Sequence, residues 1–258
     1  MRKLIILSAL ILYCGNTMKA QLTKDEVLLE MNNKSEDYGV IAQNIWEFAE
    51  MGYLEEKSSS LLQKTLRDEG FTIKKGVAGI PTAFVAEYGS GAPVIAILGE
   101  YDALPGLSQK AVPEKSSADK EAGHGCGHHL IGTASAAAAI AVKDWMKAGN
   151  NKGTIRFYGC PAEEGGSGKV YMVRDGLFND VDIALHWHPG AENEANAGSA
   201  LANKSPKERL YAISAHAAGA PEKGPTTLDL HEDLNMFRNM KTDHIKEQSM
   251  NHNLITQA

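Results

Sequence analysis

Hydrophobic periodicity divides the chain into a helical first part and a later section in which strands and helices alternate. Across residues 23–68, apolar side chains recur at the three-to-four-residue spacing of amphipathic helices. Met51-Gly52-Tyr53 interrupts this pattern, and a second helix is predicted from about Ser58 to Arg67. The apolar stripes of these helices predict faces that pack into a core rather than a ligand site.

From Phe71 onward the pattern changes to that of strands. Phe71–Lys75 and Thr82–Tyr88 alternate between apolar and polar residues, whereas Val94–Leu98 is wholly apolar and predicts a strand buried on both faces. The other predicted elements are an alanine-rich helix beginning near Leu130, a strand Thr154–Tyr158 and a buried strand Val181–Leu185. Strands that alternate with helices indicate an α/β fold.

The first twenty residues have the features of a secretory signal peptide. A basic start, Met1-Arg2-Lys3, precedes the apolar run Leu4–Tyr13, which is short for a membrane span, and cleavage is predicted after Ala20. An uncleaved anchor and a lipoprotein processed at Cys14 are the alternatives. We therefore expect an exported, periplasmic protein with no membrane contact after cleavage.

Composition and charge narrow the classes of function. The 258 residues are 43% hydrophobic and 22% charged, which is typical of a globular chain with one or two domains. Removing residues 1–20 takes away three basic residues and no acidic ones, so 23 basic residues face 32 acidic ones and the net charge is −9. This balance excludes the basic surface of a nucleic-acid-binding protein.

A cluster of histidine, cysteine and glycine in Gly123–His129 is the strongest chemical signal. A thiolate beside imidazoles suits zinc or a similar transition metal, and the helix that follows would place Cys126 at a helix N-terminus, which favours the thiolate. The alternatives are a glycine-rich turn with a buried cysteine, or a disulfide between Cys126 and Cys160 in an oxidising compartment.

Acidic residues follow two of the predicted strands. Glu100 and Asp102 come after Val94–Leu98, at the end of the strand where open α/β sheets place their sites, although a turn with a capping aspartate is an alternative. Glu163 and Glu164 follow the next strand. Adjacent side chains diverge, so one glutamate can bind a metal while the other takes a proton from water, although a solvated acidic loop is the simpler alternative.

The strand Val181–Leu185 ends in His186-Trp187-His188-Pro189. Residues two apart on a strand share a face, so both histidines could point toward one site. This is the third strand end in succession with metal-type ligands, and the repetition favours a single metal site over three separate structural features.

Together these segments resemble the aminoacylase and carboxypeptidase type of metallo-amidohydrolases, and most closely the branch with aminobenzoyl-glutamate, hippurate and auxin-conjugate hydrolases. The segments in the family's order and spacing are Glu100–Pro105, Gly125–His128, Pro161–Gly166 and Ala184–Pro189, and Ser214–Gly224 is similar to the lid signature. The resemblance implies an α/β catalytic domain with a central mixed sheet flanked by helices, and an inserted α+β lid or dimerisation domain.

The resemblance also implies roles for individual residues. The implied metal ligands are Cys126, His128, Glu164 and His186. Glu163 is the implied general base, with Asp102 supporting the site, and His216 is expected to reach the partner subunit's active site and stabilise the oxyanion. His124, His129 and His188 are left outside the ligand set, and the role of Glu100 stays open.

The implied activity is hydrolysis of an amide bond in N-acyl amino acids or aminobenzoyl-glutamate-type substrates. The implied cofactor is a divalent transition metal, zinc or manganese, with two ions in the complete enzyme. The implied assembly is a homodimer, or a heterodimer with a related subunit.

The expected organisation is a signal peptide in residues 1–20, the catalytic domain in residues 21–203 and an incomplete lid in residues 204–258. Related enzymes return from the lid to the catalytic domain for a section with one more histidine ligand, so we expect a truncated chain with little activity alone. The alternatives are an inactive exported fragment that binds metal or a partner subunit, and a disulfide-bonded periplasmic binding module.

Overall fold

The computed structural model describes residues 22–195, residue 211 and residues 227–242. The chain divides into two units, Met1–Ala191 and Glu192–Ala258, and each is described by itself. The elements of the first unit are α1 (Lys24–Asn33), α2 (Ser35–Phe48), α3 (Glu56–Asp68), β1 (Thr72–Lys75), the 3₁₀ turn η1 (Val77–Gly79), β2 (Phe84–Ser90), β3 (Val94–Glu100), β4 (Leu104–Pro105), β5 (Ala122–Gly123), α4 (His128–Gly149), β6 (Gly153–Cys160), α5 (Gly168–Arg174) and β7 (Ile183–Leu185).

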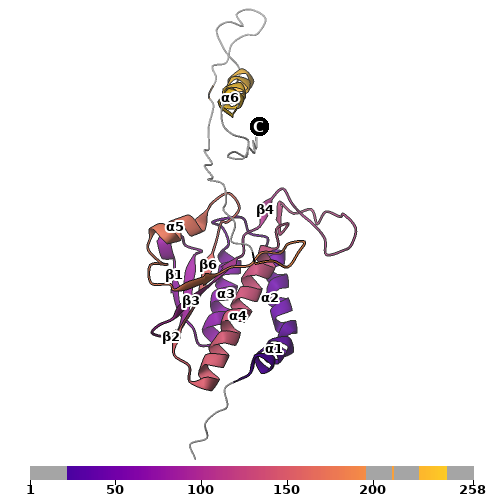
Figure 1. Cartoon of the computed structure of the whole chain (residues 1–258). Helices are drawn as coiled ribbons and strands as arrows, with labels where there is room; N and C mark the ends of the chain where they lie inside the picture. The colour runs from indigo at the N-terminus through magenta and orange to yellow at the C-terminus, as the bar shows by residue number, and fades with distance from the viewer. Residues whose placement is uncertain (1–21, 196–210, 212–226, 243–258) are drawn as a thin grey trace, which may run out of the picture. The chain divides into compact units, whose positions relative to one another are not determined.

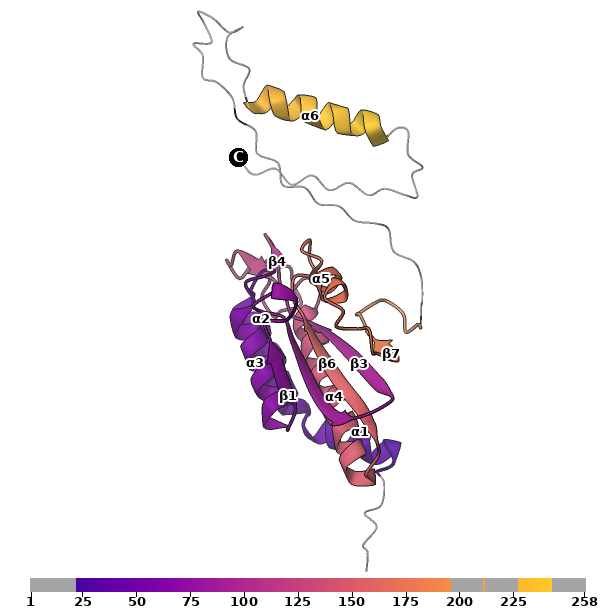
Figure 2. The same cartoon turned by 90° about the vertical axis from the view of Figure 1, so that its left-hand side faces the viewer.

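A five-stranded mixed sheet in the order β1-β2-β6-β3-β7 forms the centre of the first unit (Figure 2). β3 runs parallel to both β6 and β7, whereas β2 is antiparallel to β1 and to β6. The pairing of Glu100 with Cys160 brings the carboxyl ends of β3 and β6 to the same edge. The predicted α/β fold with a central mixed sheet flanked by helices is confirmed.

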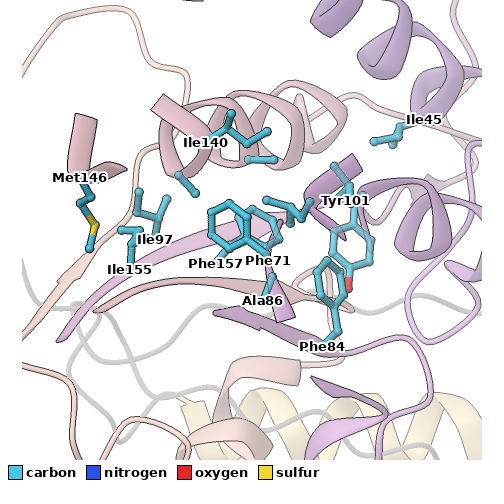
Figure 3. Packing of buried hydrophobic residues seen from close by; sticks show 14 residues of the cluster. Ile45, Phe71, Phe84, Ala86, Ile97, Tyr101, Ile140, Met146, Ile155 and Phe157 are labelled. Atoms are coloured by element: carbon cyan, nitrogen blue, oxygen red, sulfur yellow. The ribbon is translucent and has the colours of Figure 1, made fainter. Parts of the chain in front are cut away.

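One face of the sheet packs against α3 and α4, and α2 packs on these two helices (Figure 1). Alternate residues of β2, β3 and β6 enter this layer, because successive side chains of a strand point to opposite faces. Figure 3 shows Phe157 between Ile140 of α4 and Phe84, and the ring centroids of the two phenylalanines are 5.5 Å apart. Fully burying a side chain of this size contributes roughly 1.5–3 kcal/mol to stability, so this face holds the sheet against the helices.

The intervening residues of the same strands form a smaller core on the opposite face. Ala96 of β3 and Tyr158 of β6 pack there with Met172 of α5. The Tyr158 hydroxyl donates to the Leu177 carbonyl oxygen, 2.7 Å away, which satisfies its polar group. With both faces covered, the segment after β6 that leads into α5 is held in place at the carboxyl edge of the sheet.

The helical elements agree with the sequence expectations, with small shifts at their ends. The predicted helical stretch 23–68 contains three helices, and α1 begins with a capping box in which Thr23 and Glu26 satisfy each other's backbone N–H groups. α4 begins at His128 after Gly127, whose φ of +83° favours glycine, so the expected helix N-terminus at the cysteine–histidine cluster is confirmed. Among the described residues, α4 and the other helices are too short or too polar to cross a bilayer.

The prediction of a buried strand at Val181–Leu185 was wrong. The strand is shorter, Ile183–Leu185, and all three of its residues are exposed; Ile183 is 49% and Leu185 53% exposed. Among the described strands it pairs with β3 alone, at the edge of the sheet. An apolar run predicts a strand, but it does not predict which neighbours the strand has.

The described part of the second unit consists mainly of α6 (Thr227–Thr242). Apolar residues of this helix, including Leu228 and Phe237, are exposed. Several sequence predictions lie outside the described residues: the signal peptide, the boundary between residues 203 and 204, and His216 with the surrounding lid motif. These remain predictions.

Candidate metal centre

Four segments bring ionisable side chains to the carboxyl edge of the parallel strands. Glu100 ends β3 and Asp102 follows it, His128 begins α4, Glu163 and Glu164 lie after β6, and His186 follows β7; Cys126 lies two residues before α4. The sequence predicted this convergence, because parallel strands present their carboxyl ends at one edge of a sheet. Segments that are far apart in the chain therefore meet at one place.

Asp102 and His128 form a buried pair at the centre of this edge. Asp102 is 1% and His128 0% exposed, and His128 Nδ1 donates to Asp102 Oδ1 at 2.9 Å. Asp102 Oδ2 accepts from the backbone N–H of Glu164 at 2.8 Å. Asp102 thus orients the imidazole and holds the glutamate loop, while the role in catalysis that the resemblance implies for it remains a prediction.

The pKa of His128 is raised by its surroundings. Burial alone would lower it, but the hydrogen bond to Asp102 and the negative charges of Asp102, Glu100 and Glu164 outweigh burial. The same concentration of negative charge favours any cation at this position.

Three carboxylates surround the other nitrogen of the imidazole. His128 Nε2 lies 3.2 Å from Glu100 Oε2, 3.7 Å from Glu163 Oε2 and 3.9 Å from Glu164 Oε1. Both His128 Nε2 and Glu100 Oε2 are buried and have no hydrogen-bond partner. Single ligand atoms of Glu100, His128 and Glu163 all lie within 4.8 Å of one another. This donor set of carboxylate oxygens and an imidazole nitrogen fits a divalent transition metal.

A second candidate group contains Cys126, His128 and His188. Cys126 Sγ lies 3.1 Å from His188 Nε2, and the thiol also hydrogen-bonds Glu164. Burial, followed by the charge of Glu164, raises the pKa of Cys126 to about 11. A thiolate therefore needs a cation beside it in this site. Because neutral His128 has one free lone pair, at Nε2, it can serve only one ion at a time.

The two cysteines among the described residues, Cys126 and Cys160, are both free. Cys160 is fully buried, and its thiol donates to the Tyr158 carbonyl oxygen at 3.3 Å. The disulfide between Cys126 and Cys160, which the sequence left open as an alternative, is therefore wrong in this structure. Cys126 stays available to a ligand.

His186 and Lys169 both contact Glu100. His186 Nε2 donates to Glu100 Oε1 at 2.9 Å, and Lys169 Nζ donates to the same oxygen. His186 thus lies beside the site but is in neither candidate ligand group among the described residues. Its assignment as a metal ligand remains a prediction, as do those of Cys126, His128 and Glu164.

Sequence reasoning missed two residues that support the site. Lys169 belongs to no motif of the sequence, and no pattern predicted its pairing with Glu100. Glu55 is fully buried between α2 and α3, and it accepts from the backbone N–H of Ala162 at 2.8 Å and from the Thr82 hydroxyl at 2.9 Å. Burial raises the pKa of Glu55. No local sequence pattern announces such a long-range contact.

Glu55 restrains an unusual backbone at the glutamate pair. Ala162, which is buried and directly precedes Glu163, has a φ of +53°, in the left-handed region that side chains other than glycine rarely adopt. The hydrogen bond to Glu55 helps to hold that conformation, so the direction of the Glu163-Glu164 turn depends on a residue more than a hundred positions earlier.

The two remaining histidines of the cluster have supporting places. His124 is buried and its Nε2 donates to the Ile45 carbonyl oxygen at 3.0 Å. Its ring centroid lies 5.0 Å from that of His129. Burial lowers the pKa of each to about 4, so both are neutral near pH 7. They pack the loop that carries Cys126 rather than contribute charge.

An α/β sheet with carboxylates and imidazoles gathered at one edge has the architecture of a metal-dependent hydrolase. Residues 96–245 match peptidase family M20/M25/M40. The chain belongs to this family.

Curated relatives share much of the sequence. The chain is 48% identical over 223 residues to a subunit of p-aminobenzoyl-glutamate hydrolase from Escherichia coli strain K12, covering 86% of this chain and 46% of that protein. It is 30% identical over 227 residues to Xaa-Arg dipeptidase of Mus musculus, covering 83% and 49%. The chain thus spans about half the length of these relatives.

One solved structure has a similar fold, and at its low sequence identity the similarity concerns the fold only. A protein described as an aminohydrolase from methicillin-resistant Staphylococcus aureus matches with a TM-score of 0.54 and 20% identity, covering 64% of this chain and 42% of that one.

Proposed function

We propose that this chain carries the metal-binding part of an amidohydrolase that cleaves N-acyl amino acids or aminobenzoyl-glutamate-type amides. The observation that carries the proposal is the gathering of three carboxylates around the buried, unpartnered Nε2 of His128. The 48% identity to the p-aminobenzoyl-glutamate hydrolase chain supports the substrate class.

The site residues divide into holding and proton-transfer roles. His128 and Glu164, with Cys126 and His186 as the further implied ligands, would hold zinc or manganese, and the full protein would hold two ions. When bound, the metal supplies Lewis acidity to the amide carbonyl and to a water molecule.

Glu163 is best placed to move the proton. Its side chain is 44% exposed, so it faces open space where a substrate can enter, whereas Glu164 is only 22% exposed and is held by Asp102 through its backbone. Glu163 would take a proton from water and pass it to the leaving nitrogen of the amide. Asp102 keeps the proton of His128 on Nδ1, which leaves Nε2 free to bind.

We also propose that the protein assembles with a second chain and is exported. The Escherichia coli relative is one subunit of its enzyme, which supports a complex of more than one chain, and the lid histidine His216 would then act across the interface. The basic and apolar start of the sequence supports export to the periplasm. Fractionation of cells followed by N-terminal sequencing, with Gln21 as the expected first residue, tests the export.

Replacing Glu163 tests the mechanism. In the natural full-length protein with its partner subunit, Glu163→Gln should retain its metal and lose hydrolysis of p-aminobenzoyl-glutamate by on the order of a hundredfold or more, as expected for a general acid–base group. Glu36→Gln, an exposed change on α2, is the matched control and should leave turnover unchanged. Near-normal turnover by Glu163→Gln would contradict the assigned role, and a metal-free wild-type protein with full activity would contradict the proposed function.

A further inference from the structure

Glu100 occupies a fully enclosed position whose role the sequence left open. It ends β3 and is 2% exposed. Its Oε1 accepts from Lys169 Nζ and from His186 Nε2. Glu100 is therefore a buried carboxylate with one oxygen fixed in place.

The second oxygen of Glu100 faces another buried acceptor. Oε2 lies 3.2 Å from His128 Nε2, and neither atom has a hydrogen-bond partner. When His128 carries a single proton, on the Nδ1 that faces Asp102, its Nε2 presents a lone pair. Two lone pairs that face each other out of contact with water are unfavourable unless a cation satisfies both.

A proton alone does not resolve this contact. Although Glu100 Oε2 and His128 Nε2 are close enough for a hydrogen bond, both atoms are unpartnered, so their arrangement does not meet hydrogen-bond geometry. A metal ion can bind the lone pairs of both atoms from directions in which a single N–H bond could not point. The carboxylate of Glu163, within 4.8 Å of both ligand atoms, adds further negative charge.

We propose that Glu100 is itself a metal ligand, and that its Oε2 and His128 Nε2 hold one divalent cation while Lys169 and His186 fix Oε1. This inference rests on the metal dependence of the proposed function and adds a ligand that the resemblance did not imply. Ligating carboxylates are typically hydrogen-bonded through their other oxygen, which is the arrangement of Glu100 here. The hydrogen bond to Glu100 Oε1 also occupies Nε2 of His186, so only Nδ1 of that ring is left for another ion.

Metal titration of the natural full-length protein tests the proposal. After chelator treatment and dialysis, zinc and manganese are titrated calorimetrically into the wild type, Glu100→Gln and the control Glu87→Gln. Glu87 lies on β2 of the same sheet and pairs with Arg156. Because Gln keeps the shape but loses the charge, affinity for one ion should fall at least tenfold in Glu100→Gln, while Glu87→Gln should change less than twofold.

X-ray absorption of the zinc-loaded protein separates a ligand from a positioning residue. Loss of one oxygen neighbour in Glu100→Gln supports direct ligation. Weakened binding with an unchanged set of neighbours would overturn it, because Glu100 would then act only through His128 or His186. If Glu100→Gln does not fold in its metal-free form, Glu100→Asp keeps the charge but withdraws the carboxylate by one methylene, and it should weaken binding in the same way.

The outcomes distinguish this inference from the proposed function. A wild-type protein that binds neither metal would overturn both. If the wild type binds metal, and Glu100→Gln and Glu100→Asp bind it with the same affinity and stoichiometry as the wild type, only the role of Glu100 is overturned.

Discussion

Two clusters of buried charge lie along α4, and they differ in how completely their polar atoms are satisfied. Toward the end of the helix, Lys143 is 5% exposed and pairs with Glu69 at 2.8 Å and Asp144 at 2.6 Å, while Glu69 also pairs with Lys34 at 3.2 Å. None of these described residues has a buried side-chain atom without a partner. At the start of the helix, His128, His129 and Glu100 each have one.

The difference separates a structural cluster from a functional one. The Lys143 cluster ties α4 to the end of α3 and to the junction of α1 and α2, and its charges balance one another. The cluster at His128 has more carboxylates than cations, and its His128 and Glu100 each carry an unpartnered buried atom. A buried charge that is not neutralised is costly, so this second cluster is complete only with a bound cation.

Of the changes proposed for these two clusters, adding metal should change the free energy of unfolding most. At a free zinc concentration of about one hundred times the dissociation constant, binding to the folded state should stabilise it by about 2.7 kcal/mol. His128→Ala should lose this increment, because it removes the atom on which the candidate groups converge. Urea unfolding with zinc and with chelator measures it; an equal increment in His128→Ala would place the metal elsewhere.

Breaking the satisfied cluster should lower stability without affecting the metal. Glu69→Gln removes the main partner of the buried Lys143, while Asp144 remains, and it should cost about 1–2 kcal/mol given the partial exposure of Glu69. The zinc increment should be unchanged. The control Asp68→Asn breaks the exposed pair with Lys64 and should cost under about 0.5 kcal/mol. A reduced zinc increment in Glu69→Gln would show that the two clusters are coupled.

The smallest expected effect is the change with pH in the contribution of the Lys143 cluster to the free energy of unfolding. Partial burial alone would raise the pKa of Glu69, but hydrogen bonds from Lys143 and Lys34 outweigh it and lower the pKa below the ordinary 4.5. Its ionisation therefore contributes stability that is fully present above about pH 4.5 and is lost as the pH falls through the lower folded-state pKa. The difference in unfolding free energy between wild type and Glu69→Gln should shrink over that range. A difference that grows on acidification would contradict the direction of this pKa shift.

The sequence predicted the parts of this structure that depend on local pattern. Strand ends with acidic or histidine residues, and the helix that begins at the cysteine–histidine cluster, follow from periodicity and turn chemistry, so Asp102, His128 and the Glu163-Glu164 pair were found. The hydrogen bond between Asp102 and His128 was not predicted, because the two residues are 26 positions apart.

What the sequence did not predict depends on long-range contacts. Glu55 reaches Ala162 across 107 positions, and Lys169 reaches Glu100 across 69. Neither contact has a sequence motif. The partner of a buried ion pair, or of a carboxylate that accepts a backbone N–H, can lie on any element that packs nearby. The exposure of β7 was not predicted for the same reason, since burial depends on which elements become neighbours.

The position of the bound ion decides whether His128 and Glu100 form the metal site. Crystals of the natural full-length protein soaked in zinc, with data collected on both sides of the zinc absorption edge, give the ion's position without reference to any ligand assignment. We expect an anomalous-difference peak for zinc about 2.0–2.2 Å from His128 Nε2 and from Glu100 Oε2. A peak bonded to neither atom, in a protein that binds zinc, would contradict it.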